Sequence, residues 1–381
     1  MDPCSYSTWL EIDLGAIRNN VSALQVLSGC PVMAVIKANA YGHGAIPVAQ
    51  AVVEAGAAWC GVSRLEEALA LRQAGLVGSI LVLGYTPPDR APLAIANRVS
   101  LTVYDPALVA KYVAYAQDGL GDLRVHVKIE TGMGRLGIAY EKAADFIFSL
   151  NRQPGLKIEG IFTHFARADE PEASATRLQI NRFQAVLDAI NAQGIYPAWV
   201  HASNSAGTIY HQDGRFNLVR AGVAIYGLHP SAAAPLPGNF LPALSWKTRL
   251  TSIKDLPAGY GISYGSHYLT SKVERIGVIP VGYADGFRRV DNQEVLLNGQ
   301  IVRVVGRVCM DQCMLQIDKL PLANLEDEVV ILGRQGSQVI SAEDIARRWG
   351  TNNYEVVCGL AARLPRVYLN SSGKELNSYI S

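Results

Sequence analysis

Lys37 stands in the most unusual chemical context in the chain. It follows the apolar run of residues 32–36, and the small-residue stretch "ANAYGHGA" comes after it. An ammonium group at the end of a buried strand loses most of its hydration, so it needs a partner or a different chemical state. An unprotonated lysine amine can form a Schiff base with a carbonyl compound. Taken alone, however, a strand-end lysine is more often one half of an ion pair.

Other polar or small residues also lie where predicted strands end. They are Arg135, His164, Asn204, Ser205, Arg220 and Gly222. Each has an ordinary explanation by itself, such as a helix cap, a structural histidine or a turn. The packing of a barrel core requires none of these residues. Because they lie at several successive strand ends, they indicate one shared site.

Eight short apolar runs must position these residues. Most are rich in β-branched residues and bounded by Gly, Pro, Asp or Asn, as strands are. Apolar residues at helical spacing fill the stretches between them. The pattern predicts an α/β fold, a (β/α)8 TIM-like barrel within residues 1–238, whose strand ends meet at one mouth. A doubly wound open sheet is the alternative, but no GxGxxG follows the first strand. The predicted strands are residues 32–38, 58–63, 79–85, 99–105, 124–130, 156–166, 197–205 and 217–227.

A second domain is predicted after the Pro/Ala/Gly-rich stretch "LHPSAAAPLPGN". Residues 239–381 contain further apolar runs but few helical patterns, which predicts a mostly β C-terminal domain. "LNGQ" between two apolar runs is a hairpin signal. The early strand-like piece "TWLEID" precedes the barrel, and its pattern leaves open which domain it packs with.

Composition excludes several classes of partner. Lys plus Arg is 34 and Asp plus Glu is 33, which gives a net charge of +1. This balance offers no electrostatic reason to expect nucleic acid or an anionic membrane. The six cysteines form no CxxC pair and have no histidines at zinc-finger spacing, so we expect reduced thiols, no metal site and a cytoplasmic protein.

The loops after the seventh and eighth predicted strands resemble a phosphate site. "SNSAG" and "RAGVA" supply small residues, a hydroxyl and backbone N–H groups where barrels of this kind bind phosphate. A Schiff-base lysine beside a phosphate site indicates pyridoxal 5'-phosphate as cofactor. An imine would also explain how Lys37 tolerates its position.

The sequence resembles a known enzyme family over nearly its whole length. "AVIKANAYGHG", "TGMGRLG", "NLVRAGVAIYG", "ISYGSHY", "VGYADGFRR" and "GRVCMDQ" occur in the order found in the alanine racemases, the fold-type III pyridoxal phosphate enzymes. The resemblance implies an isomerase that converts L-alanine to D-alanine, for peptidoglycan or alanine catabolism. It also implies a homodimer whose active site is shared between subunits.

The resemblance also implies roles for individual residues. Lys37 would hold the cofactor and act as base on one face of the substrate, and Tyr264 of the partner subunit would act on the other face. Arg220 would meet the pyridine nitrogen, and Lys128 matches a position that can be carbamylated. The remaining cofactor-binding residues would be Tyr41, Arg135, His164, Asn204, Ser205, Gly222, Val223 and Tyr354. The substrate-binding residues would be Arg135, Met310, Tyr264, Tyr283 and Asp311.

Three alternatives remain open. A fold-type III decarboxylase of basic amino acids would carry an acidic group at the ring nitrogen, where Arg220 stands, and would lack Tyr264. A non-catalytic pyridoxal phosphate-binding protein would be a lone barrel. A serine or broad-specificity racemase is the strongest alternative, although Tyr354 in "NNYEVVCG" resembles the alanine form and should crowd a longer substrate.

Overall fold

The computed structural model describes residues 5–116, 121–370 and 375–379, which fall into two compact units. The barrel unit comprises Ile17–Ala40 and Ala45–Leu241. The β unit comprises the described residues up to Ala16, the short segment Tyr41–Gly44, and those from Pro242 onward. The units therefore interleave along the chain. No helix in the described ranges is long and apolar enough to cross a membrane.

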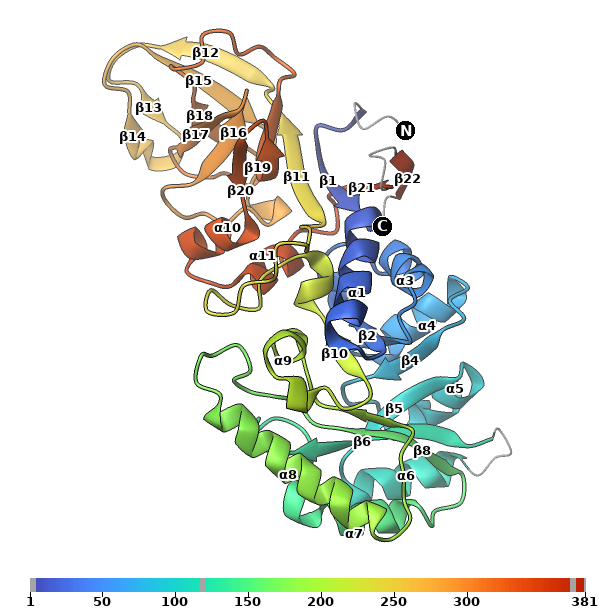
Figure 1. The fold of residues 1–381 in the computed structure, drawn as a ribbon. Coiled ribbons are helices and arrows are strands. Elements are labelled where there is room, and N and C mark those ends of the chain that lie inside the picture. Colours follow the sequence, from blue (N-terminus) through green and yellow to red (C-terminus); the bar gives the residue numbers. More distant parts are fainter. Residues whose placement is uncertain (1–4, 117–120, 371–374, 380–381) are drawn as a thin grey trace. The chain divides into compact units, whose positions relative to one another are not determined.

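The barrel unit contains all eight predicted strands (Figure 1). They are hydrogen-bonded in the order β10-β2-β3-β4-β5-β6-β8-β9, and every neighbouring pair is parallel. Backbone bonds from Asn217 N–H to the Val200 carbonyl and from Arg220 N–H to the Ser203 carbonyl close the ring. The strands are β2 (Val32–Val35), β3 (Trp59–Val62), β4 (Ser79–Val82), β5 (Val99–Val103), β6 (Leu123–Glu130), β8 (Leu156–Phe162), β9 (Trp199–His201) and β10 (Val219–Ala221).

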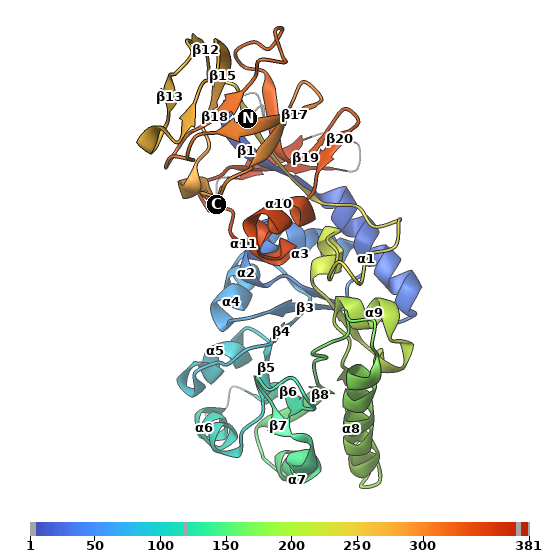
Figure 2. The same cartoon turned by 90° about the vertical axis from the view of Figure 1, so that its left-hand side faces the viewer.

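Helices lie outside these strands, as Figures 1 and 2 show for α4 to α8. Strands β2, β3 and β5 are buried along their whole length, as expected when helices cover one face and barrel side chains fill the other. The short strand β7 (Ile138–Ala139) pairs in parallel with the end of β6. The main helices are α1 (Leu14–Ser28), α3 (Ala45–Glu54), α4 (Leu65–Gln73), α5 (Ala91–Ala96), α6 (Pro106–Ala116), α7 (Tyr140–Leu150), α8 (Ser174–Asn191) and α9 (Ser205–Tyr210).

The β unit is built on one long sheet of order β12-β15-β18-β17-β16-β19-β11-β1-β21-β22, with β20 on β19 and a separate β13-β14 pair. Its strands are β11 (Leu244–Arg249), β12 (Ser252–Leu256), β13 (Gly261–Ile262), β14 (Tyr268–Leu269), β15 (Glu274–Ile279), β16 (Glu294–Leu297), β17 (Gln300–Val305), β18 (Cys313–Gln316), β19 (Glu328–Gln335), β20 (Gln338–Ile340), β21 (Arg366–Leu369) and β22 (Glu375–Tyr379). The mostly β second domain is thereby confirmed. Helices α10 (Ala342–Trp349) and α11 (Asn353–Cys358) complete it.

Two details of this sheet answer questions left by the sequence. The "LNGQ" hairpin joins β16 to β17, and Asn298 and Gly299 both have positive φ (50° and 72°), as a type I′ turn requires. The piece "TWLEID" forms β1 (Thr8–Asp13), which pairs with β11 and β21. The first strand of the chain therefore belongs to the C-terminal sheet.

Candidate active site

Lys37 lies two residues beyond the end of β2 and begins a left-handed turn. Within this turn, labelled α2 (Lys37–Tyr41), Ala38, Asn39 and Ala40 have φ of 53–54° and ψ of 46–52°. Left-handed helical backbone costs L-residues about 1–2 kcal/mol each. Two side chains offset part of this cost, because Glu67 accepts the Ala38 N–H at 2.6 Å and Asn39 accepts the Ala45 N–H at 2.7 Å. Strained backbone of this kind concentrates at functional sites.

Arg220 on β10 is a buried cation held only by neutral acceptors. Its Nη2 lies 2.8 Å from the carbonyl oxygens of Thr163 and Ala202 and 3.1 Å from His164 Nδ1, and its Nη1 lies 2.9 Å from His201 Nδ1. It makes no ion pair with a carboxylate in the described parts of the chain. Burial and then the charge of Arg135 lower the Arg220 pKa to about 9, so the guanidinium still carries its charge at neutral pH.

Two further histidines extend this network into the barrel core. His201 Nε2 lies 2.9 Å from His126 Nδ1, and both residues are fully buried. Because Arg220 can only donate, His201 must accept at Nδ1, carry its proton on Nε2 and donate to His126. Burial, then Arg220, lowers the His126 pKa to about 3 and holds the His201 pKa well below its ordinary value. Gly160 leaves room for the pair, since a Cβ there would lie 2.6 Å from His126 Nδ1.

The basic side chains of the barrel mouth converge on His164. Burial lowers the pKa of His164 well below its ordinary value, and the charges of Arg220, Lys128, Arg135 and Lys37 lower it further, in that order. Predicted site residues on or after three strands, β2, β6 and β10, thus act on one imidazole. A mouth with this excess of basic groups is suited to an anionic ligand.

Lys128 on β6 has a buried amine with no hydrogen-bond partner in the part of the chain that the structure describes. Its Nζ lies 4.7 Å from the centre of the Phe162 ring. Burial, then Arg220, holds the Lys128 pKa well below its ordinary value, which favours the neutral amine. A neutral amine is nucleophilic, and a buried amine without hydrogen bonds is stabilised by any group that bonds to it.

Glu130 positions the loop that carries Arg135. Its carboxylate accepts the N–H groups of four consecutive residues, at distances of 2.5 to 3.2 Å: Gly132, Met133, Gly134 and Arg135. Burial by itself raises the Glu130 pKa, but the four N–H bonds outweigh it and leave the pKa below its ordinary value. We did not predict this role, although an acidic residue two positions before the G-x-G of "TGMGR" is a usable signal.

Backbone donors without acceptors gather after β9 and β10. The N–H groups of Ser205, Ala206 and Val223 find no acceptor among the described residues, although all three residues are buried. Ser205 Oγ accepts from the N–H groups of Gly222 and Ala224 at 3.1 and 3.3 Å and so joins the two loops. Buried N–H groups without partners are rare in folded proteins. Their donor chemistry fits a phosphate.

Asn204 has a different function from its neighbours in this arrangement. Its side-chain oxygen accepts the Gly207 N–H at 2.9 Å and caps α9. The cap orients the turn that bears Ser205, and the Asn204 side-chain amide N–H donates to the Phe165 carbonyl at 3.4 Å.

The remaining predicted site residues lie in the β unit. Tyr264, Tyr283 and Met310 are 70%, 46% and 54% exposed, and Asp311 lies next to Met310. Tyr264 is flanked by Ser263 and Gly265, which have positive φ of 63° and 76°. The loops that carry these residues are thus shaped by special backbone conformations.

Tyr41 and Tyr354 form a second group in the β unit, with ring centres 6.3 Å apart. Tyr41 is buried, and burial, then Tyr354, raises its pKa above the ordinary value. Its hydroxyl therefore keeps its proton at neutral pH.

The barrel mouth, with a strand-end lysine among basic groups and unpaired N–H donors, has the features of a barrel enzyme whose site suits an anionic ligand. Comparison with known families agrees. Residues 12–230 match the family model described as alanine racemase, N-terminal domain, and residues 243–368 match alanine racemase, C-terminal domain. The chain belongs to the alanine racemase family.

Individual relatives match nearly the whole chain. An alanine racemase of Symbiobacterium thermophilum is 45% identical, over 95% of this chain and 97% of that protein. The crystal structure of alanine racemase from Bacillus anthracis with bound L-Ala-P has a TM-score of 0.91 at 41% identity, covering 98% of this chain and 97% of that one. Alanine racemase of Clostridium difficile in complex with cycloserine has a TM-score of 0.91 at 37% identity, covering 98% of each chain.

Proposed function

We propose that this chain racemises alanine with pyridoxal 5'-phosphate. The observation that carries the proposal is the barrel mouth itself, where Lys37 stands among basic groups that all act on His164. Relatives at 45% and 42% identity over 95% of the chain are named alanine racemases. Arg220 is basic and stands where the decarboxylase alternative would carry an acidic group for the ring nitrogen.

The residues present fit the cofactor. The unpaired N–H groups of Ser205, Ala206 and Val223 would hold the phosphate, with the Tyr41 and Tyr354 hydroxyls as further donors. When bound, pyridoxal phosphate withdraws electrons from the Cα of an attached amino acid and makes its proton removable. The chain must then supply the attachment point, the bases and the control of charge.

Arg220 controls the charge at the ring nitrogen. Its guanidinium donates and does not readily release a proton, so a ring nitrogen that faces it stays unprotonated. Its four neutral acceptors hold the guanidinium without cancelling its charge. A weaker electron sink results, which limits side reactions such as transamination.

Lys37 and Tyr264 act as the two opposing bases. Lys37 removes or returns the Cα proton on one face, and Tyr264 does so on the other. Racemisation needs a base on each face, because the proton leaves one side and arrives on the opposite side. Tyr264 is 70% exposed in the single chain, as expected for a residue that contacts the surface of another subunit in the complete site.

A homodimer provides that surface. In a closed two-fold dimer each subunit can lend Tyr264, Tyr283, Met310 and Asp311 to the barrel of its partner, which gives two equivalent sites. Sedimentation of the purified protein at several concentrations tests this point. A monomer with full activity would contradict it.

Lys128 is proposed to carry a carbamate. Its neutral amine attacks CO2, the new N–C bond forms as one C–O π bond opens, and the amine proton leaves to solvent. The product anion would satisfy the orphaned nitrogen and pair with the nearby arginines. A bound 13C signal after incubation with labelled bicarbonate, absent in Lys128→Ala, would support this assignment, and its absence from the wild-type protein would contradict it.

Substrate choice is tested by a direct comparison of two amino acids. Purified protein with pyridoxal phosphate is given L-alanine or L-serine in heavy water, and D-isomer and Cα deuterium are followed by NMR. Rapid alanine turnover with slow serine turnover supports the proposal, since one extra group is discriminated by about 1–3 kcal/mol. Equal or faster serine turnover would favour the serine or broad-specificity alternative. A cytoplasmic location and a role in peptidoglycan or alanine catabolism stay predictions.

A further inference from the structure

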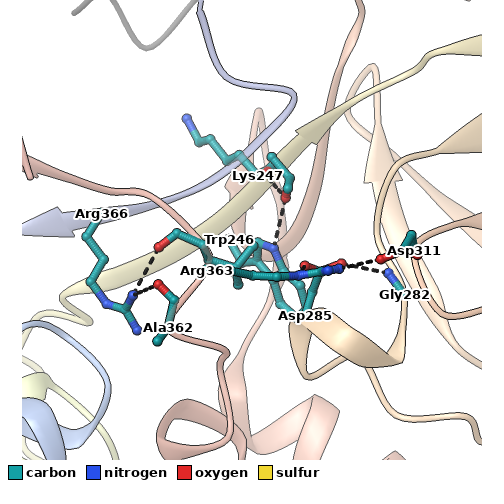
Figure 3. A network of polar contacts seen from close by, with 10 residues as sticks. Trp246, Lys247, Gly282, Asp285, Asp311, Ala362, Arg363 and Arg366 are labelled. Atoms are coloured by element: carbon teal, nitrogen blue, oxygen red, sulfur yellow. Dashed lines mark hydrogen bonds and ion pairs between the residues drawn. The ribbon is translucent and has the colours of Figure 1, made fainter. Parts of the chain in front are cut away.

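Arg363 bridges two carboxylates in the β unit, on the loops that carry substrate-side residues (Figure 3). Its Nε donates to Asp285 Oδ1 at 2.7 Å, and its Nη2 donates to Asp311 Oδ1 at 2.8 Å. Asp285 is only 2% exposed, whereas Arg363 and Asp311 are about half exposed. Removal of the cationic partner of a buried carboxylate costs stability, because it leaves a buried charge without compensation.

The bridge ties two loops whose backbones already touch. The Tyr283 N–H donates to the Cys309 carbonyl and the Ala284 N–H donates to the Met310 carbonyl, each at 3.0 Å. Gly282 permits this approach, since a Cβ there would lie 2.2 Å from the Met310 carbonyl oxygen. The turn before Arg363 is fastened to the same pair of loops.

Asp285 makes the remaining connections. Its second carboxylate oxygen accepts the Gly282 N–H at 2.9 Å, and its own carbonyl accepts the Ala361 N–H at 3.1 Å. Three segments are therefore linked by Asp285 and Arg363: residues 282–285, 309–311 and 361–363. Among the described residues, only the Arg363 side chain bonds to the Asp311 carboxylate.

The Met310 N–H is the group whose direction this network sets, and it has no acceptor in the described ranges. It shares a peptide plane with the Cys309 carbonyl, which the Tyr283 N–H holds at 3.0 Å. Arg363 fixes the two loops of this contact relative to each other through Asp285 and Asp311, and so fixes the direction of that N–H. A preorganised donor binds an anion better than one that must first be ordered.

We propose that Arg363 is a positioning residue that aims the Met310 N–H at the substrate carboxylate and thereby sets the affinity for the amino acid. This inference rests on the proposed function and on the family resemblance, which implies that the Met310 backbone N–H binds that carboxylate. A donor that contacts the carboxylate equally in the ground and transition states changes KM and leaves kcat almost unchanged. A bridge that only holds the fold together would change stability and leave KM alone.

The experiment compares Arg363→Met with Arg363→Lys and with a control pair in the same unit. Arg347, which pairs with Asp344 at 3.1 Å and is 77% exposed, supplies the control Arg347→Met. We measure KM and kcat for L-alanine, and the dissociation constant of propionate, which has the carboxylate without the amine. Arg363→Met should raise KM and the dissociation constant of propionate about tenfold, while kcat stays within about twofold of the wild-type value. Arg363→Lys should recover part of the lost affinity.

Two results would overturn the inference. One is a folded Arg363→Met protein with the wild-type KM and propionate affinity. The other is a change no larger than that in Arg347→Met. If Arg363→Met does not fold, Asp311→Asn tests the exposed half of the bridge. We expect KM to rise about threefold in this variant, and an unchanged KM would contradict the inference. A wild-type protein that does not racemise alanine would count against the proposed function instead.

Discussion

The two groups of candidate site residues differ in burial and in chemistry. In the barrel unit Arg220 and Lys128 are buried and basic, and Arg220 is held by four hydrogen bonds. In the β unit Tyr264, Tyr283 and Met310 are exposed on loops. Under the proposed function the two groups would have separate roles: the barrel would be preorganised for the cofactor, and the β unit would present the groups that complete the site for a substrate.

Replacement of Lys37 is the strongest test of the role assigned to the barrel residues. Lys37→Ala removes both the attachment point and one base, so activity should fall by at least about 10³-fold. The visible absorption band of lysine-bound cofactor should also disappear. Lys157→Ala, an exposed lysine at the opposite end of β8, should keep both. A Lys37→Ala protein that retains the band would contradict the assignment.

Changing the charge at Arg220 sharpens the account of the barrel mouth. Arg220→Glu should slow racemisation by about 10²-fold or more, because the ring nitrogen would now be protonated and the basic cluster would gain a negative charge. The half-transamination product pyridoxamine phosphate should accumulate faster than in the wild-type protein. Chromatography of the cofactor after long incubation with alanine measures it. If pyridoxamine phosphate does not accumulate faster, the argument that Arg220 weakens the electron sink is wrong.

The buried histidines predict how stability depends on pH. The folded barrel keeps His126, His164 and His201 neutral, with the His126 pKa lowered to about 3, whereas the unfolded chain protonates them below about pH 6.5. The free energy of unfolding should therefore be highest above about pH 6.5. It should fall as the pH drops toward 3, by up to about 1.4 kcal/mol per pH unit for each histidine.

Denaturant titrations between pH 4 and 7 measure this slope. His126→Asn should reduce it by about 1.4 kcal/mol per pH unit relative to the wild-type protein. His267→Gln, at an exposed histidine of the β unit, should leave it unchanged. Equal slopes in all three proteins would show that His126 is not held neutral by the fold.

The smallest expected effect concerns Glu130. Glu130→Gln weakens the four N–H bonds that shape the Arg135 loop, so the protein should lose about 1–2 kcal/mol of stability, and KM should rise modestly. Glu141→Gln, in the first turn of α7, is the matched control. Urea titration and KM for L-alanine provide the measurements. Identical behaviour of the two variants would mean that Glu130 does not position the loop.

Local patterns in the sequence were sufficient to predict the eight barrel strands and the "LNGQ" hairpin. Strand burial and turn residues are encoded within a few neighbouring positions, as the type I′ φ values of Asn298 and Gly299 show. Residues at strand ends were also predictable, because the barrel fold brings the ends together.

Other features depend on contacts between residues far apart in the chain. The left-handed turn of Ala38 to Ala40 has no glycine to announce it, and Glu67 stabilises it from another helix. His126 and His201 stand within ordinary apolar strand patterns and meet only when the barrel closes. Arg363 finds Asp285 and Asp311 across 78 and 52 residues, so no local pattern indicated its role.

The central claim is that the lysine of the barrel and the tyrosine of the β unit serve opposite faces of one substrate. The direct test is Tyr264→Phe, loaded with cofactor and given L-alanine or D-alanine separately in heavy water, with Cα exchange and isomer composition followed by NMR. The account predicts that Cα exchange persists for one enantiomer only, through Lys37, while racemisation falls by about 10²-fold or more. Racemisation at the wild-type rate, with exchange of both enantiomers, would contradict it.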